Sequence, residues 1–221
     1  MKFYPIFVRL AGRPCVVIGG GEVAERKVES LLDAGARVTL ISPVVTSGLA
    51  QRIAAGEIAH RERCYRRGDL AGAFLTYAAT DDEAANHEIA SEAGDEGVLL
   101  NAVDKPAFCD FIVPAVVQRG DLVIATSTSG ASPTMARRIR EEIETRFGPE
   151  YAEALSILRA VRERLAAEGR PFEERKRVLA ELIDAPLVDF VRAGDRDAIE
   201  RLVVGAVGSA VLLDCLEAPP G

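Results

Sequence analysis

The sequence predicts an α/β fold: a doubly wound parallel sheet, then a small α+β segment, then a helical domain. Strand-like and helix-like patterns alternate through the first half of the chain, as they do where helices connect parallel strands. Residues 14–18 form a continuous apolar run, which is typical of a strand buried on both faces. A glycine-rich string joins this run to a helical pattern. After residue 110 the alternation gives way to two β-rich runs and then to helices.

Each expected element of the sheet has a local reason. Ala24, Val28 and Leu31 share one face of a helix over 22–34, and Gly35 is the expected C-terminal stop. The remaining expected strands are 37–41, 58–61, 74–78 and 98–101, and the remaining expected helices are 46–55 and 82–93. This order predicts a Rossmann-like, doubly wound parallel sheet.

The second half of the chain follows a different pattern. Two β-rich runs, 111–118 and 122–126, flank a short polar turn and predict a hairpin. An apolar residue at every fourth position predicts a helix over 133–147, which Gly148 and Pro149 end. Residues from 150 onward have helical patterns, with a frayed tail expected at 218–221. The patterns predict three domains over residues 1–112, 113–149 and 150–221, and the last of them is helical.

Composition and charge exclude several classes of protein. The 27 basic and 34 acidic residues give a net charge of −7, which argues against a general nucleic-acid surface. No apolar run is long enough to span a bilayer, so we expect no membrane segment. Pro5 and Arg9 interrupt the short apolar stretch at the start, so we expect no signal peptide. We therefore expect a cytoplasmic protein. The four cysteines are dispersed and there are two histidines, so we expect isolated thiols and no metal site.

The glycine-rich string is the first motif with a chemical meaning. Residues 19–24 match G-x-G-x-x-A between the buried strand and the helix. Gly19 permits the tight turn, Gly21 lets a pyrophosphate approach the backbone, and Ala24 allows close packing of the helix on the strand. The free amides at the helix start can then bind the anion. The motif predicts dinucleotide binding, and the alternative is a tight turn without a ligand.

One part of the usual dinucleotide site is missing. A ribose-binding Asp or Glu is expected at the end of the second strand, where this chain has Ser42, Pro43 and Val44. Ser42 can still bond a ribose hydroxyl. No Arg follows at once to meet a 2′-phosphate, so these residues leave NAD and NADP open.

Two other strand ends bring polar residues to the same edge of the sheet. Thr80 can line the nucleotide site; the alternative is helix capping by Thr80 or Asp81, with Asp82 serving only the helix dipole. Asp104 follows the strand that ends near Asn101, and it is a candidate general base or proton relay. The alternative for Asp104 is an ordinary turn residue.

A Ser-rich loop opens the helix after the hairpin. Ser132 suits the N-cap and Pro133 the first helical position, while Met135 provides no capping box. Open amides, hydroxyls and the nearby Arg137 make a seat for a carboxylate or phosphate. The alternative is a plain cap followed by a solvated face, in which glutamates balance the arginines.

Six motifs together resemble one known family. They are residues 5–7, 17–27, 78–82, 101–104, 111–115 and 129–133, and they occur in this order and spacing. On these motifs the chain resembles the precorrin-2 dehydrogenase / sirohydrochlorin ferrochelatase module of siroheme synthases. The match covers about residues 1–150, and the helical remainder has no sharp motif.

The resemblance implies an activity and a cofactor. Family members oxidise precorrin-2 to sirohydrochlorin and pass a hydride to NAD⁺, and some also insert Fe²⁺ to make siroheme. Whether this chain inserts metal stays open. The expected cofactor is NAD, and the residues expected to bind it are Gly19, Gly21, Glu22, Val23, Ser42, Pro43, Val44 and Thr80.

The resemblance also implies roles around the tetrapyrrole. Asp104 matches the essential aspartate of the family, and residues 127–132 match the segment that faces the tetrapyrrole. The expected substrate-binding residues are Asn101, Ser127, Thr128, Ser129, Gly130, Ser132 and Arg137. Family members are homodimers built through the segment after the nucleotide domain, and without a following methyltransferase domain we expect a stand-alone form.

Two rival hypotheses stay open on the sequence. The first is a chelatase that acts on sirohydrochlorin without turnover of NAD, and the intact glycine loop argues against it. The second is a non-enzymatic NAD-sensing regulatory subunit, which leaves Asp104 and the Ser-rich loop without a role.

Overall fold

The computed structural model of the chain describes residues 3–208. These residues belong to two compact units, the first ending at Val113 and the second beginning at Pro114. The expected boundary after residue 112 falls one residue before this point, and the expected division at residue 149 stays a prediction. The expected tail at 218–221 and Cys215 lie outside the described residues.

The first unit is built on five parallel strands in the order β3-β2-β1-β4-β5. The strands are β1 (Pro14–Ile18), β2 (Arg37–Ile41), β3 (Ala59–Arg61), β4 (Leu75–Ala78) and β5 (Leu99–Ala102). Ile18 is in register with Ile41 and Ala78, so the central strands end level with one another. The predicted doubly wound parallel sheet is confirmed, and its C-terminal edge carries the loops of interest.

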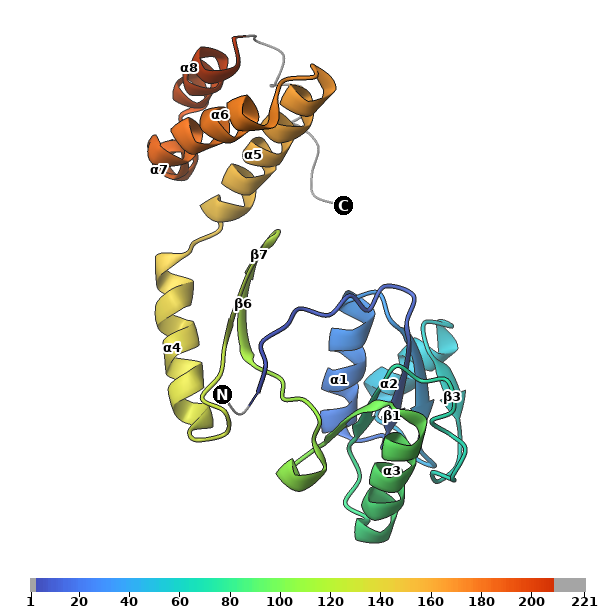
Figure 1. Ribbon diagram of the computed structural model, residues 1–221. Coiled ribbons are helices and arrows are strands. Elements are labelled where there is room, and N and C mark those ends of the chain that lie inside the picture. Colours follow the sequence, from blue (N-terminus) through green and yellow to red (C-terminus); the bar gives the residue numbers. More distant parts are fainter. Residues whose placement is uncertain (1–2, 209–221) are drawn as a thin grey trace. The chain divides into compact units, whose positions relative to one another are not determined.

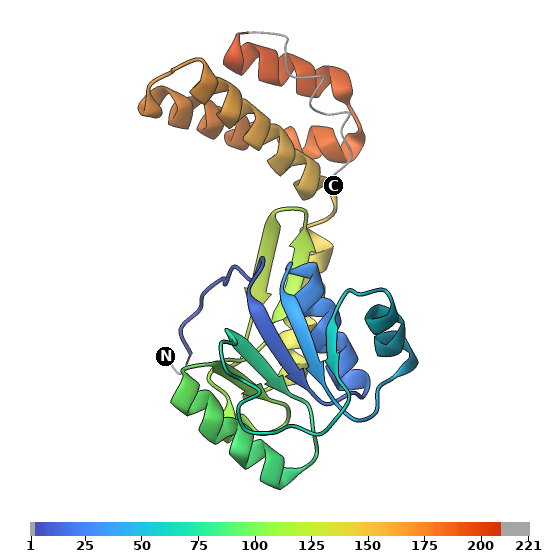
Figure 2. The same ribbon diagram turned by 90° about the vertical axis from the view of Figure 1, so that its right-hand side faces the viewer.

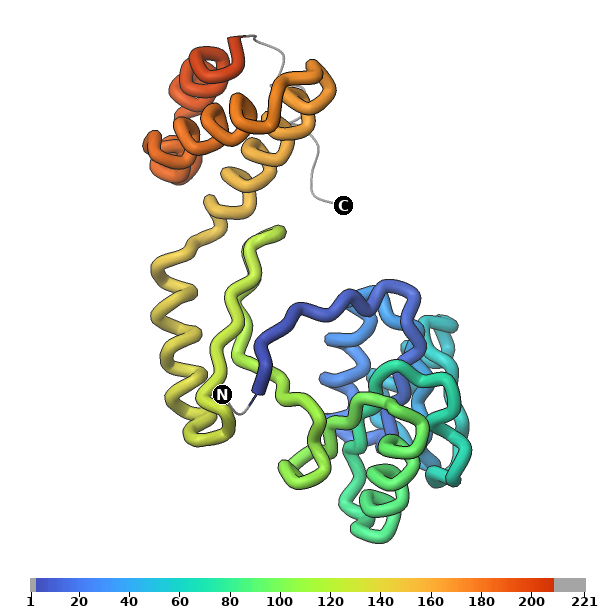
Figure 3. The backbone as a smooth tube through the Cα atoms, viewed as in Figure 1, coloured from blue at the N-terminus to red at the C-terminus, as the bar shows by residue number. Residues whose placement is uncertain are grey.

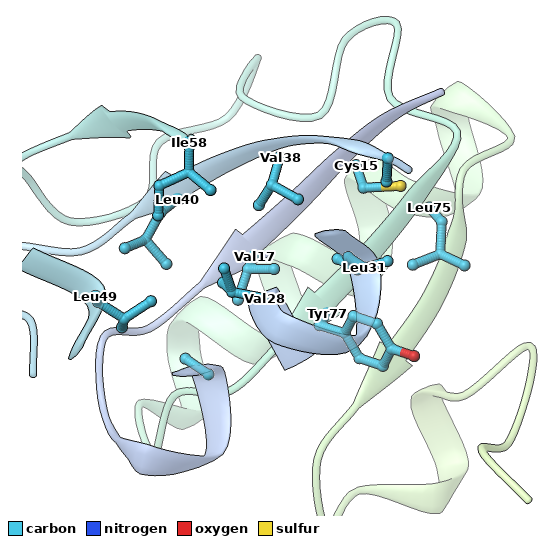
Figure 4. Packing of buried hydrophobic residues seen from close by; sticks show 12 residues of the cluster. Cys15, Val17, Val28, Leu31, Val38, Leu40, Leu49, Ile58, Leu75 and Tyr77 are labelled. Atoms are coloured by element: carbon cyan, nitrogen blue, oxygen red, sulfur yellow. The ribbon is translucent and has the colours of Figure 1, made fainter. Parts of the chain in front are cut away.

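Helices cover both faces of this sheet (Figures 1 and 2). Helices α1 (Glu22–Asp33) and α2 (Ser47–Ala54) pack on one face, and α3 (Glu83–Glu96) packs on the other. Neighbouring strand residues point to opposite faces, so Val17 belongs to the core under α1 while Val16 belongs to the core under α3. Figure 4 shows the first core, in which Val17, Val28 and Leu40 are fully buried.

The start of α3 differs from the sequence expectation. Asp82 is its N-cap, and the Asp82 carboxylate accepts a hydrogen bond from the Ala85 amide at 3.1 Å. Thr80 does not cap the helix; its hydroxyl accepts from the Asp82 amide at 3.3 Å. The expectation that Asp82 serves only the dipole is therefore wrong, because its carboxylate stands three residues before a free helix amide.

Buried carboxylates hold the long loop between β3 and β4. Asp69 accepts hydrogen bonds from Arg61 at 2.5 Å and from Arg63 at 2.7 Å, and from the Arg66 amide at 2.9 Å. Glu92 of α3 accepts from the Tyr65 hydroxyl and from the amides of Gly68 and Leu70 at 2.9 and 2.7 Å. Two acids therefore fix a loop that has no regular secondary structure.

The second unit begins with an antiparallel hairpin of β6 (Ala115–Arg119) and β7 (Leu122–Thr126). Helix α4 (Pro133–Arg146) lies along it (Figure 1). Val117 faces inward and is buried, whereas Val116 and Val123 are exposed on the other face. The expected hairpin is confirmed, although the strand begins at residue 115 and not at 111.

Within the described residues, four helices follow α4 in the second unit, and Figure 3 traces their backbone. They are α5 (Glu150–Ala167), α6 (Phe172–Asp184), α7 (Leu187–Ala193) and α8 (Arg196–Val207). Their shared core includes Val161, Leu165 and Leu182, which are fully buried. The hairpin turn contacts α5 through an ion pair between Asp121 and Arg159. The predicted helical character of this region is confirmed as far as residue 207.

Candidate active site

The glycine turn after β1 has no room for side chains at its first position. Gly19 has φ of +113°, and a Cβ atom there would lie 2.1 Å from the carbonyl oxygen of Ala79. The Gly19 amide donates to the Ile41 carbonyl at 2.9 Å, and the Ala79 amide donates to the Ile18 carbonyl at 2.7 Å. The turn is therefore pressed between the loops that follow β2 and β4, as the motif predicts.

Gly20 is a structural requirement that the motif did not identify. A Cβ atom at Gly20 would lie 1.9 Å from the Val44 carbonyl oxygen and 2.6 Å from Ser42 Oγ. The Gly20 carbonyl also accepts from the Thr46 amide at 2.9 Å. The motif leaves this position free, but here the loop after β2 closes directly on it.

Gly21 is open where Gly19 and Gly20 are crowded. It is the N-cap of α1 with φ of −84°, and a Cβ atom would meet nothing within 4 Å. Glu22 is exposed and Val23 is half-buried. The start of α1 therefore presents backbone to open space with no capping side chain, which is the arrangement that binds an anion at a helix N-terminus.

The loop after β2 is fastened to α1. The Ser42 hydroxyl, which is buried, donates to the Val44 carbonyl at 2.6 Å, while Pro43 and Val44 are exposed. The Thr46 hydroxyl donates to the Glu25 carboxylate at 2.5 Å and caps α2 by accepting from the Leu49 amide. The Ser42 proton is therefore used within the loop, and the expected bond between Ser42 and a ribose hydroxyl stays a prediction.

The loop after β4 is held by a buried amide. Asn86 of α3 is 2% exposed, and its Nδ2 donates to the Thr80 carbonyl at 2.9 Å. Thr80 is half-buried and adjoins Ala79, whose carbonyl lies against Gly19. Thr80 therefore follows directly after the residue that contacts the glycine turn, and its expected part in nucleotide binding stays a prediction.

Asp104 stands on a tight turn after β5. It is exposed, and its backbone is left-handed with φ of +59°. The Val103 amide before it donates to the Ala78 carbonyl of β4 at 2.9 Å. Asn101 Nδ2 donates to the Phe111 carbonyl at 2.9 Å, so this amide group fastens the exit of the loop. The expected role of Asn101 in substrate binding stays a prediction.

The Ser-rich loop of the second unit is a self-bonded turn. The Thr128 hydroxyl donates to the Ser132 carbonyl and accepts from the Ser132 amide, each at 3.0 Å. Ser127 Oγ accepts from the Ser129 amide at 3.0 Å. Ser132 caps α4 by accepting from the Met135 amide at 3.2 Å, as predicted.

The arginines that follow this cap are paired along the helix. Arg137 lies 3.1 Å from Glu141 and Arg138 lies 3.7 Å from Glu142, and the Arg137 side chain is 77% exposed. This corresponds to the solvated charged face that was the alternative interpretation of the arginines. Any substrate carboxylate must compete with Glu141 for Arg137.

Two regions of the chain match known protein families. Residues 6–115 match a family described as NAD(P)-binding, and residues 119–146 match one described as sirohaem biosynthesis protein central. The siroheme synthase of Ectopseudomonas mendocina is 39% identical over 203 residues, which cover 92% of this chain and 44% of the relative. That of Methylococcus capsulatus is 35% identical over 210 residues, 95% of this chain and 44% of the relative.

This chain is also similar to a solved structure over the full length of that structure's chain. That structure is described as SirC, precorrin-2 dehydrogenase, and it matches with a TM-score of 0.77 and 26% identity. The alignment covers 90% of this chain and 100% of that one. This chain belongs to the precorrin-2 dehydrogenase / sirohydrochlorin ferrochelatase family. It spans less than half the length of the curated siroheme synthases that it matches.

The residues of this family member fit a dinucleotide. The match to the NAD(P)-binding family contains the glycine turn, which supports NAD as the cofactor. Crowding forbids a Cβ at Gly19 and Gly20, while Gly21 leaves the start of α1 open. Both features are what a diphosphate at the helix N-terminus needs.

Backbone strain in the family member lies at two predicted site residues. Within residues 3–208, Asp104 and Ser129 are the non-glycine residues with positive φ, at +59° and +53°. A left-handed backbone costs such residues about 1–2 kcal/mol, and this cost is often found at functional sites. Each unit therefore holds one predicted site residue in an unfavourable conformation.

Two further findings concern metals and membranes. Within the described part of the chain, no group of three or more His, Cys, Asp or Glu side chains is arranged to hold a metal ion. No helix in the same residues has both the length and the apolar character that crossing a membrane requires.

Proposed function

We propose that the chain is an NAD-dependent precorrin-2 dehydrogenase of siroheme biosynthesis. The match to SirC over the whole of that chain supports the activity, and the glycine turn supports the cofactor. The observation that carries the proposal is Asp104, an exposed carboxylate held left-handed at the same sheet edge as the glycine turn.

In this mechanism the chain binds the dinucleotide by its backbone. Gly19 and Gly20 shape the turn, and the amides at the start of α1 bind the diphosphate. Pro43, Val44 and Thr80 line the sides of this site. Bound NAD⁺ supplies the acceptor for one hydride.

Asp104 accepts the proton that the substrate loses in addition to the hydride. Conversion of precorrin-2 to sirohydrochlorin removes one hydride and one proton, and a carboxylate can take the proton as a general base. Asp104 is suited to this role because it is exposed, lies in a hydrogen-bonded turn, and forms no ion pair with another described residue.

The Ser-rich loop supplies donors for the acidic substrate. Ser127, Ser129, Gly130 and Ser132 surround the start of α4, where backbone amides favour anions. Arg137 adds a guanidinium that can exchange Glu141 for a carboxylate of the tetrapyrrole. These contacts position the substrate and do not take part in the chemical step.

We also propose a homodimer in the cytoplasm. The hairpin supports the dimer, because Val116 and Val123 leave an apolar face exposed at 41% and 36%. The free thiols Cys15, Cys64 and Cys109 are typical of a reducing compartment.

An anaerobic assay in two steps tests the activity. Precorrin-2 and NAD⁺ are mixed with the protein, and the formation of sirohydrochlorin and NADH is followed by absorption. Fe²⁺ is then added to preformed sirohydrochlorin without NAD⁺, which measures metal insertion separately. Metal insertion without NADH formation supports a chelatase, and NAD binding without turnover of either tetrapyrrole supports a regulatory subunit; both contradict the proposal.

A single substitution tests the role of Asp104. Asp104→Ala removes the base, and we expect turnover to fall by about 10²-fold or more, the usual contribution of a general base. The Kd for NAD⁺ stays within about twofold, since Asp104 makes no part of the glycine turn. Unchanged turnover would remove Asp104 from the mechanism.

A further inference from the structure

The thiol of Cys109 holds the turn that carries Asp104. Cys109 Sγ lies 3.2 Å from the Ala102 carbonyl oxygen and 3.5 Å from the Lys105 carbonyl oxygen. These carbonyls lie on either side of Asp104 in the chain. One S–H donor therefore lies within hydrogen-bond distance of both arms of the turn, and Cys109 is half-buried.

The same carbonyls complete the local hydrogen-bond network. The Lys105 amide donates to the Ala102 carbonyl at 3.2 Å, and the Phe108 amide donates to the Lys105 carbonyl at 3.0 Å. Each carbonyl has a second lone pair, which the thiol can use. Burial raises the pKa of the Cys109 thiol above its ordinary value, which favours the protonated form that can donate.

The base and the flank of the turn are fastened by other residues. The Asp110 amide donates to the Leu100 carbonyl at 2.8 Å, and the Asp110 carboxylate accepts from the Leu100 amide at 2.9 Å. Lys105 Nζ lies 3.0 Å from the Glu83 carboxylate. The Phe108 and His87 rings pack edge to face, with their centroids 4.9 Å apart. These contacts close the loop but lie outside the turn, so the thiol is the side-chain donor directed into it.

We propose that Cys109 is a positioning residue for Asp104, which it holds in its left-handed conformation through the Ala102 and Lys105 carbonyls. This inference rests on the proposed role of Asp104. Without the thiol the turn can relax toward ordinary backbone angles, and the carboxylate moves away from the position in which it takes the proton. Small displacements of a base are costly in rate and leave cofactor binding unchanged.

Two substitutions separate the donor from the volume of the side chain. Cys109→Val keeps a similar volume without a donor, and the φ of −99° and ψ of 120° at this position suit a β-branched residue. Cys109→Ser keeps a donor. The exposed thiol of the β3–β4 loop provides the matched control, Cys64→Ser.

The expected results follow from the loss of one hydrogen bond. We expect Cys109→Val to lower kcat for precorrin-2 by about fivefold and to leave the Kd for NAD⁺ within about twofold. Cys109→Ser recovers at least about half of the wild-type kcat, and Cys64→Ser has wild-type values. Hydrogen exchange at the Lys105 amide is faster in Cys109→Val and near normal in Cys109→Ser.

A double variant separates this inference from the proposed function. In an Asp104→Asn background Cys109→Val should lower kcat no further, because the effect runs through the Asp104 carboxylate. If Asp104→Asn lowers kcat but Cys109→Val does not, the positioning role is wrong and the proposed function stands. If Asp104→Asn itself keeps full turnover, the proposed role of Asp104 fails first. An equal fall for Cys109→Val in both backgrounds also overturns the inference.

Discussion

Adjacent glycines of the turn after β1 have opposite surroundings. A Cβ at Gly20 would lie 1.9 Å from the Val44 carbonyl oxygen, whereas a Cβ at Gly21 would meet nothing within 4 Å. The fold therefore requires glycine at position 20. At position 21 the absence of a side chain leaves the start of α1 open to a ligand. This difference can be measured with alanine at each position.

Gly20→Ala should damage the fold and the cofactor site together. The added methyl group must push the loop after β2 away from the turn, which we expect to cost about 1–3 kcal/mol of unfolding free energy. Denaturant unfolding followed by circular dichroism measures this loss. A variant of wild-type stability would show that the loop after β2 gives way without cost.

Gly21→Ala should weaken NAD⁺ binding without affecting stability. Alanine is a poorer N-cap than glycine but also reduces the entropy of the unfolded chain, and these effects are similar in size and opposite in sign. We expect stability within about 0.5 kcal/mol of wild type and a Kd for NAD⁺ raised about tenfold. Calorimetric titration measures the Kd. Wild-type affinity would mean that the diphosphate does not approach Gly21.

Single side chains were the hardest features to predict from the sequence. The pattern correctly predicts that Ser42, Thr80 and Asn101 lie near the C-terminal edge of the sheet, because the parallel strands end together there. It did not reveal that the Ser42 hydroxyl donates to the Val44 carbonyl, or that the Asn101 amide donates to the Phe111 carbonyl. Those partners depend on loop conformation, and no periodicity encodes it.

The loop between β3 and β4 shows how charge organises an element without regular structure. Asp69 is buried beside Arg61 and Arg63, and the hydrogen bond from Arg63 is the main cause that lowers its pKa to about 2. The depressed pKa means that the folded state favours the carboxylate. The stabilisation is present above the ordinary pKa, near 4, and is lost as the pH falls toward 2.

Asp69→Asn should therefore remove an acid-sensitive part of the stability. We expect a loss of about 2 kcal/mol at pH 7 that shrinks between about pH 4 and pH 2, where the wild-type carboxylate also becomes neutral. Urea unfolding at a series of pH values measures it. Glu62→Gln, an exposed neighbour in the same loop, is the matched control and should behave as wild type. A loss that is equal at pH 7 and pH 2 would contradict the electrostatic cause.

At the scale of elements the sequence was a better guide. The strands and helices of the first unit follow from apolar runs and from glycine and proline stops, so their order and their parallel pairing could be predicted. Ends were less certain. Three acidic or hydroxyl residues, Thr80, Asp81 and Asp82, compete for the start of α3, and the spacing to the Ala85 amide selects Asp82.

At the scale of the molecule, the hairpin has one face on which the apolar side chains of Val116 and Val123 are exposed. Val116 lies opposite Ala125 and Val123 lies opposite Gln118 on this face, and the β6–β7 pair forms a sheet of two strands within the described residues. Isolated hairpins are marginally stable in water. Helix α4 packs on the hairpin, and in the proposed homodimer a second copy of the chain covers the face with Val116 and Val123.

Val116→Glu tests this assembly. A carboxylate buried in an apolar interface is costly, so we expect the dimer Kd to rise by about thirtyfold or more while each chain stays folded. Light scattering across a dilution series, with circular dichroism as the check on folding, measures this shift. Ile183→Glu places the same charge on α6, at a side chain that is 64% exposed and remote from the hairpin in sequence, and it should leave the dimer intact. A wild-type chain that is monomeric at micromolar concentration, or a Val116→Glu chain as dimeric as wild type, would show that this face is not the interface.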